Sequence, residues 1–175
     1  MDNKNLSISR NSINSIGEHI DTFMSVNDKE LQWLYETAKK MQSIVEIGSC
    51  KGRSTYSLCS SNCPLVISID DFKVYPCPYD DFLENTKKFK NLRQLKMLSN
   101  QACSFVIDVD MVFIDGMHDY SSVMQDLVNW RPKAKKLICG HDYCDEEWTD
   151  VKKAVNDFFG VVPEVYETIW MMKGA

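Results

Sequence analysis

Hydrophobic positions along this chain switch between two patterns, one typical of buried strands and one typical of amphipathic helices. Short apolar runs predict strands at 44–47, 65–69, 95–98, 111–114 and 136–140, with one or two closing strands within 165–173. Apolar residues at three- and four-residue intervals predict helices at 27–41, 54–61, 81–89, 101–106, 120–131 and 148–159. Strands that alternate with helices predict an α/β fold with a doubly wound, mostly parallel sheet, helices on both faces and an antiparallel closing strand.

The N-terminal stretch differs from the rest of the chain. Residues 1–26 are polar, rich in Asn and Ser, and weakly patterned, so we expect an arm or lid followed by a single domain at 27–175. Ile13, Ile16 and Ile20 could form a short amphipathic helix within the arm. Asn27 and Glu30 have the spacing of a capping box, which marks the start of the first helix of the domain. A length of 175 residues fits one domain.

Composition and charge exclude several classes of partner. The net charge of −5 argues against nucleic acid, which needs a basic face. The chain has no apolar run as long as a membrane span, and its N-terminus lacks the apolar core of a signal peptide. The seven cysteines have no zinc-site spacing, so we expect reduced thiols in a cytoplasmic protein. A homo-oligomer is left open.

Acidic residues, histidines and glycines follow the predicted strands. In doubly wound sheets the ligand lies at the carboxyl ends of the strands, and these residues would meet there. They are Gly48–Gly52, Asp70 and Asp71, Ser99 and Asn100, Asp115–His118, and His141 with Asp142. We therefore expect a binding site for a small polar ligand at this edge of the sheet.

The stretch Glu46–Ser54 is the centre of this expected site. Gly48 and Gly52 would let the backbone approach a ligand closely, and the N-terminus of the following helix favours negative charge. Glu46 interrupts an apolar strand, and an acid in that position needs a partner. The glycine spacing is Gly-x-x-x-Gly, without the Gly-x-Gly-x-x-Gly of nicotinamide enzymes.

These motifs resemble those of the class I S-adenosylmethionine (SAM)-dependent methyltransferases. The resemblance is strongest to small-molecule O-methyltransferases such as catechol O-methyltransferase, and to a related family of sugar-tailoring and uncharacterised bacterial methyltransferases. The matching segments are Glu46–Ser54, Ile67–Asp70, Phe113–Tyr120 and Gly140–Tyr143. The resemblance covers about Val45 to Phe159. It implies a Rossmann-like fold, SAM as cofactor and a small-molecule acceptor methylated at oxygen.

The resemblance also implies a set of cofactor-binding residues. They are Glu46, Gly48, Ser49, Cys50, Gly52, Ser54, Asp70, Asp71, Ser99, Asn100, Gln101 and Asp115. Asp70 would accept hydrogen bonds from both ribose hydroxyls, and the segment 99–101 would contact adenine. Ser54 would bind the cofactor's carboxylate, while Glu46 would orient the loop or meet its ammonium group.

Methyl transfer needs an acceptor oxygen that is held behind the methyl group and is polarised or deprotonated. His118 is the candidate base, with Asp115 beside it, because His118 stands where the catechol enzyme's motif has its catalytic lysine. A histidine that caps a helix or fills a loop is the alternative for His118. Substrate binding and orientation of a loop are the alternative roles for Asp115.

Asp115, His141 and Asp142 form a candidate site for a divalent metal. Metal-dependent relatives present oxygen ligands at these positions, as magnesium prefers. His141 departs from that pattern, which favours manganese, iron or zinc over magnesium and leaves metal-free chemistry open.

Aromatic residues after the second strand are candidates for the wall of the acceptor site, together with the N-terminal arm. They are Phe72, Tyr75, Tyr79 and Phe82, although Phe82 is equally suited to the core. The tryptophans, Trp148 among them, are assigned to packing. Two other functions stay open: a cofactor-binding or regulatory protein without catalysis, and a nicotinamide-dependent oxidoreductase, which the glycine spacing disfavours.

Overall fold

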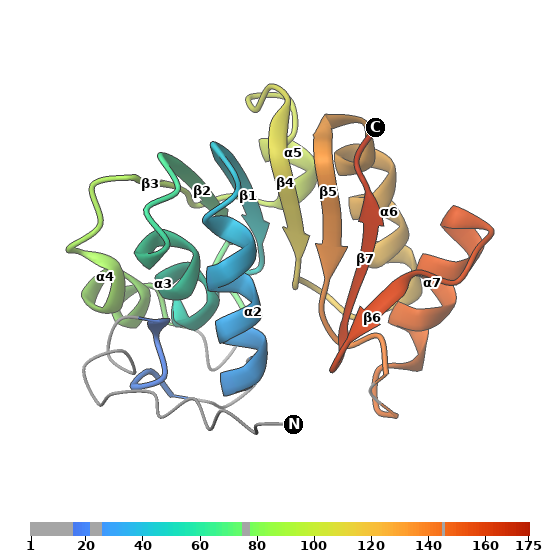
Figure 1. Cartoon of the computed structure of the whole chain (residues 1–175), viewed down its shortest axis with the longest axis horizontal. Coiled ribbons are helices and arrows are strands. Elements are labelled where there is room, and N and C mark those ends of the chain that lie inside the picture. Colours follow the sequence, from blue (N-terminus) through green and yellow to red (C-terminus); the bar gives the residue numbers. More distant parts are fainter. Residues whose placement is uncertain (1–15, 22–25, 75–77, 145) are drawn as a thin grey trace, which may run out of the picture.

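The computed structural model describes residues 16–21, 26–74, 78–144 and 146–175 (Figure 1). Its strands form one sheet in the order β3-β2-β1-β4-β5-β7-β6. The strands are β1 (Ser43–Ile47), β2 (Leu65–Ile69), β3 (Leu92–Leu95), β4 (Val109–Ile114), β5 (Ala134–Gly140), β6 (Glu164–Tyr166) and β7 (Ile169–Lys173). Strands β1 to β5 pair in parallel, and β7 pairs antiparallel with both β5 and β6. The predicted Rossmann-like fold class is confirmed.

Helices cover both faces of the sheet (Figure 1). They are α2 (Asp28–Ala38), α3 (Arg53–Ser60), α4 (Tyr79–Thr86), α5 (Ser99–Ala102), α6 (Tyr120–Trp130), the 3-10 turn η1 (Arg131–Lys133) and α7 (Thr149–Phe159). One hydrophobic cluster joins α2 and α3 to the sheet, and a second joins α5, α6 and α7 to it. No helix in the described ranges is long and apolar enough to cross a membrane.

The alternation of side chains along β1 decides which residues face the site. Ile44 packs in the cluster under α2 and α3, whereas Val45 and Ile47 pack in the cluster under α6 and α7. Since side chains of a strand alternate between faces, Glu46 lies on the same face as Ile44, toward α3. Glu46 is fully buried there.

Local signals in the sequence explain several helix ends. Asn27 and Glu30 form the predicted capping box at the start of α2. Asp119 caps α6 by accepting a hydrogen bond from the backbone N–H of Ser122. Gly160 ends α7 in the left-handed conformation that glycine adopts at no steric cost.

The third strand was predicted three residues too late. The structure places β3 at Leu92–Leu95, where it pairs with Val66–Ile69 of β2. Leu98 instead precedes α5 and is 45% exposed. The apolar spacing of 95–98 suited a strand, but the pairing with β2 fixes the register upstream.

The helices α4 and α5 also begin two residues before their predicted starts, as expected of boundaries inferred from pattern alone. In the predicted arm, Ile16 and Ile20 are buried. Ile13 lies outside the described residues. The division into an arm and a domain stays a prediction.

The order of the strands produces a crevice beside β1. The chain runs outward from β1 through β2 to β3, and then returns to place β4 on the other side of β1. This reversal is the topological switch point of the sheet, where doubly wound folds bind their ligands.

Candidate active site

The glycine turn after β1 packs against the end of β4. The Gly48 N–H donates to Ile69 O at 2.9 Å, and the Asp115 N–H donates to Ile47 O at 2.8 Å. Gly48 has φ +82°, and a Cβ at this position would lie 1.9 Å from the carbonyl oxygen of Asp115. Glycine is therefore required here for the close approach of two backbones as well as for its φ.

The carboxylate of Asp70 holds this turn from the end of β2. Its Oδ2 accepts from the N–H groups of Ser49 and Cys50, both at 2.9 Å, and its Oδ1 accepts from the Phe72 N–H at 2.7 Å. A carboxylate offers about four acceptor positions, and three are used. The structure thus gives Asp70 a role in shaping the cofactor loop, which the sequence did not suggest. The role in ribose binding stays a prediction.

The carboxyl of Glu46 lies beneath the same turn, among hydroxyl groups. Thr55 donates to Glu46 Oε2, and the hydroxyls of Ser54 and Ser49 also bond to this carboxyl. Among the described residues, Glu46 Oε1 has no hydrogen-bond partner. Burial raises the pKa of Glu46 to about 7, although the hydroxyls lower it. Ser54 therefore bonds to Glu46 in this structure, and its role in binding the cofactor's carboxylate stays a prediction.

The segment expected to contact adenine lies at the start of α5. The Ser99 hydroxyl bonds to the buried carboxyl of Asp126 and accepts a hydrogen bond from Trp130 Nε1 at 2.7 Å. Asn100 and Gln101 are exposed. Ser99 thus anchors α5 to α6, and Asn100 and Gln101 remain free to meet a ligand.

Residues after Asp70 form a small aromatic cluster. The ring of Phe72 lies 4.8 Å from Tyr79 and 5.2 Å from Phe82, measured between centroids. Phe82 is fully buried and packs as core, while Phe72 and Tyr79 are half-buried. Tyr75 lies outside the described residues. Asp71 accepts from the Lys73 N–H in this loop.

His118, Asp115 and Asp142 converge at the carboxyl ends of β4 and β5. His118 Nε2 lies 2.8 Å from Asp142 Oδ2, and the cap of α6 is supplied by Asp119, so His118 is not a capping residue. Burial lowers the pKa of His118, but contact with Asp142 outweighs it, so the pKa is raised overall. Burial raises the pKa of Asp115 to about 6. The group combines an imidazole and two carboxyls in a half-buried site.

His141 occupies a different position in this group. Its Nε2 lies 2.9 Å from Glu30 Oε2, and its Nδ1 lies 2.9 Å from Asp142 Oδ1 and 3.6 Å from Asp115 Oδ1. Burial opposes the charged form, but the three carboxylates raise the pKa of His141 to about 11. These carboxylates favour the charged form of His141, in which each ring nitrogen carries a proton and no lone pair is available to a metal.

The donor set that suits a metal is Asp115, His118 and Asp142, whose ligand atoms lie within 4.8 Å of one another. His118 Nε2 is buried, and its nearest described partner is the carboxylate oxygen Oδ2 of Asp142, at 2.8 Å. These residues fit a divalent cation. The sequence predicted Asp115, His141 and Asp142 as the metal ligands. The structure groups Asp115 and Asp142 with His118 instead of His141.

Three residues of the site were not identified from the sequence. Glu30 was recognised only as a capping residue, because its partner His141 lies 111 residues away in the sequence. Trp148 stacks on His118, with ring centroids 4.5 Å apart, although it was assigned to packing. Arg53, inside the glycine motif, is 2% exposed and donates to the carbonyls of Val26 and Ile20. No local sequence pattern predicts contacts between residues so far apart in the chain.

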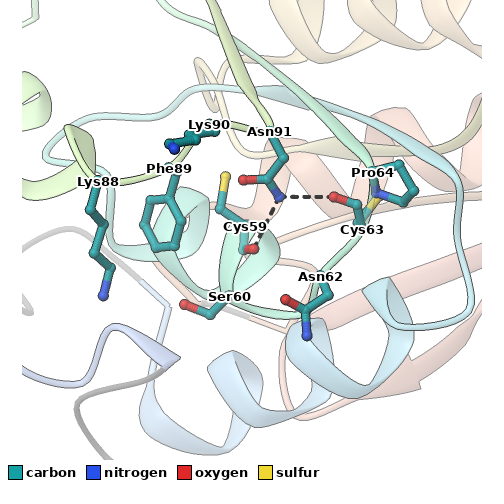
Figure 2. Close-up of a pocket in the computed structure, with 9 residues that line it drawn as sticks. All are labelled: Cys59, Ser60, Asn62, Cys63, Pro64, Lys88, Phe89, Lys90 and Asn91. Carbon is teal, nitrogen blue, oxygen red and sulfur yellow. Dashed lines mark hydrogen bonds between the residues drawn. The ribbon is translucent and has the colours of Figure 1, made fainter.

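A separate pocket of about 490 Å³ lies at the opposite edge of the sheet (Figure 2). It is lined by Cys59, Ser60, Asn62, Cys63, Pro64, Lys88, Phe89, Lys90 and Asn91. Asn91 spans it and donates to the carbonyls of Cys59 and Cys63. These residues precede β2 and β3, so the pocket is remote from the carboxyl ends of the strands, which carry the acids and histidines. We place the candidate active site at those carboxyl ends.

The cysteines differ from the expectation at one position. Free thiols are found at Cys59, Cys63, Cys103, Cys139 and Cys144. Cys50, in the glycine turn, is disulfide-bonded, so the expectation of reduced thiols is wrong there.

Comparisons with known proteins agree with this geometry. An O-methyltransferase from Bacillus cereus in complex with SAH has a TM-score of 0.66 at 14% identity, covering 94% of this chain and 88% of that one. TomG, an O-methyltransferase from Streptomyces achromogenes in complex with SAM, has a TM-score of 0.64 at 13% identity, covering 94% and 89%. An SAH-bound methyltransferase from Podospora anserina has a TM-score of 0.69 at 12% identity, covering 87% and 81%.

At these identities the structural matches show the fold alone. Comparison with curated proteins gives no match. A family model, the methyltransferase domain, matches residues 45–143, which is more than half of the chain and includes the glycine turn and both histidines of the site. The chain therefore belongs to the methyltransferase domain family.

Proposed function

We propose that this protein transfers the methyl group of SAM to a hydroxyl oxygen of a small molecule, with His118 as the base. The observation that carries the proposal is the position of His118 against Asp142, beside the glycine turn and at the switch point of the sheet. The bound SAM and SAH of structurally similar methyltransferases support the choice of cofactor.

The glycine turn would bind the cofactor through its backbone. Asp70 keeps the turn in one conformation through Ser49 and Cys50, and its remaining acceptor position would take a ribose hydroxyl. The exposed Asn100 and Gln101 would lie beside the adenine. The cofactor's sulfonium would then face the end of β4, where Asp115 and His118 lie.

The chemistry needs a proton acceptor near the hydroxyl of the acceptor molecule. His118 Nδ1 would take the hydroxyl proton, with Nε2 kept beside Asp142, while the oxygen bonds to the methyl carbon and the carbon–sulfur bond breaks, leaving a neutral thioether. Asp142 would stabilise the imidazolium that forms, and general-base catalysis of this kind contributes about 10²–10⁴-fold. Alignment of oxygen, carbon and sulfur contributes the larger share, up to roughly 7–11 kcal/mol.

A metal-assisted form of the same reaction is the second candidate, because Asp115, His118 and Asp142 fit a divalent cation. A bound divalent ion would lower the pKa of the acceptor hydroxyl and orient it. His118 would then be a ligand instead of the base. The mixed nitrogen and oxygen donors favour manganese, iron or zinc over magnesium.

Calorimetric titration with SAM and with SAH tests the cofactor. We expect binding by the wild type and its loss in Asp70→Ala, because both the ribose contact and the loop would be affected. Absence of heat and of a thermal shift with either ligand would refute the proposal. Binding without turnover over a panel of hydroxyl acceptors would support a regulatory protein instead.

The same panel separates the two chemical forms. Protein treated with EDTA is assayed alone and after addition of Mn²⁺, Zn²⁺ or Mg²⁺. Activity that survives EDTA supports His118 as the base, and activity that returns only with a metal supports the second form.

A further inference from the structure

Four side chains form an unbroken line of contacts that ends at His118. Glu30 Oε2 lies 2.9 Å from His141 Nε2, His141 Nδ1 lies 2.9 Å from Asp142 Oδ1, and Asp142 Oδ2 lies 2.8 Å from His118 Nε2. Glu30 belongs to α2, whereas His141 and Asp142 follow directly after β5, more than a hundred residues later in the chain. The line therefore connects the first helix of the domain to the reacting group.

We propose that Glu30 is a positioning residue for methyl transfer, which fixes the ring of His141 and, through it, the carboxylate of Asp142 beside His118. This inference rests on the proposed function. It holds in both chemical forms, because Asp142 contacts the reacting group as orienting carboxylate or as metal ligand. In this role Glu30 acts only through the residues in between, since its four contacts are with Asn27, His141 and Thr168.

Helix capping does not account for the environment of Glu30. A capping box requires only one contact of the Glu30 side chain, the hydrogen bond that its Oε2 accepts from the Asn27 N–H at 2.8 Å. Glu30 is instead 1% exposed, and its Oε1 accepts from both the N–H and the hydroxyl of Thr168, at 3.0 and 2.7 Å. With His141, all four acceptor positions of the carboxylate are occupied, so the side chain has one orientation.

The fixed carboxylate leaves the ring of His141 one orientation as well. Both of its nitrogens face carboxylates, and rotation of the ring would break both contacts. The backbone is held on either side, because the His141 N–H donates to Ile114 O and the Tyr143 N–H donates to Thr168 O. Thr168 thus bonds both to Glu30 and to the loop that carries Asp142, so it links these two parts of the line of contacts.

Asp142 needs this support because its backbone is unusual. It has φ +61°, a conformation that costs energy for a residue other than glycine and persists only when its surroundings impose it. Contacts from two histidines hold the side chain in this conformation. Loss of the His141 contact would let Asp142 turn away from His118.

Glu30→Gln tests the proposal, because the amide keeps the size of the side chain but cannot accept at all four positions. We expect kcat to fall about 10- to 100-fold, the range found when outer partners of catalytic ligands are removed. SAM affinity, measured by calorimetry, should be unchanged because the cofactor turn is formed by other residues. Asn27→Ala is the matched control: it weakens the same helix cap but leaves His141 paired, so kcat should stay near that of the wild type.

A spectroscopic measurement keeps the test independent of the acceptor. The chain has three histidines, so ¹⁵N-histidine labelling gives one pair of ring signals for each of His19, His118 and His141. In Glu30→Gln the signals of both His141 and His118 should move, while those of His19, which packs on Tyr56, stay in place. Asn27→Ala should leave all three unchanged.

Movement of His141 alone, with His118 and kcat unchanged, would overturn the proposal. Equal effects of Glu30→Gln and Asn27→Ala would reduce Glu30 to a capping residue and would also overturn it. If Glu30→Gln does not fold, Thr168→Val removes one hydrogen bond to Glu30 and should shift the same two rings by less. An inactive wild type whose His118 and His141 signals respond as expected would contradict the proposed function but not the line of contacts.

Discussion

Glu46→Gln probes the buried carboxyl beneath the glycine turn. Glu46 is fully buried and bonded to the hydroxyls of Thr55, Ser54 and Ser49, and no charged partner in the described ranges lowers its pKa. Its pKa lies at about 7, against an ordinary value of 4.5. The folded chain therefore holds a proton on Glu46 at pH values where the unfolded chain has lost it.

The sign of the effect follows from this difference in proton binding. Below pH 4.5 Glu46 is protonated in both the folded and the unfolded state, so it makes no pH-dependent contribution to stability. Between pH 4.5 and 7 the unfolded state has lost the proton and the folded state still holds it. The free energy of unfolding therefore falls as pH rises through this range. At about 1.4 kcal/mol for each pKa unit, the loss is about 3 kcal/mol by pH 7 and constant above it. Glutamine cannot ionise, so Glu46→Gln should lack this loss.

Urea unfolding of wild type and variant between pH 4 and 8 provides the measurement. The stability of Glu46→Gln relative to wild type should increase by about 3 kcal/mol as the pH rises from 4.5 to 7. Glu36→Gln, at an exposed position on α2, is the control for the glutamate-to-glutamine change itself. A difference for Glu46→Gln that is independent of pH, or that decreases as pH rises, would refute the reasoning. A packing cost of the amide that does not depend on pH would lower the stability of the variant equally at every pH, so it would not change how the difference in unfolding free energy varies with pH.

Three further predictions follow from single contacts. Gly48→Ala should destabilise the fold by about 3 kcal/mol or more, because its methyl group would overlap the carbonyl of Asp115; a loss below 1 kcal/mol by denaturation would contradict the packing. Arg53→Met should cost roughly 1–3 kcal/mol for each backbone carbonyl left unpaired, measured in the same way, and a neutral result would show that water replaces the guanidinium. If His118 is the base, kcat/KM should rise with pH through a pKa above 6.5, since the contact with Asp142 favours the protonated form that cannot accept a proton; a rise complete at lower pH would argue against that contact.

The sequence predicts the architecture well because short-range signals agree with the fold. The apolar run 65–69 is β2 with the same ends, and the capping box at Asn27 starts α2. Where a strand is short and half-exposed, as β3 is, apolar spacing does not determine the register, and the pairing with β2 does. Element order is therefore more predictable than the ends of edge strands.

The place of the site is predictable for a topological reason. Residues that follow parallel strands meet at one edge of the sheet, so Asp115, His118, His141 and Asp142 were expected together, and the structure brings them together. Their partners could not be predicted in the same way. Glu30 reaches the site from α2, and its distance from His141 along the chain carries no periodic signal.

The two histidines at the strand ends differ because of what surrounds each ring. Both ring nitrogens of His141 face carboxylates, which favour its protonated form. In His118, Nε2 lies beside Asp142 and the flat side of the ring lies against Trp148, which under the proposed function leaves Nδ1 to take the proton. From the sequence, His118 was the candidate base and His141 a candidate metal ligand. The buried carboxylate of Glu30 contacts His141, and we propose that this contact gives His141 a structural role and leaves the chemistry to His118.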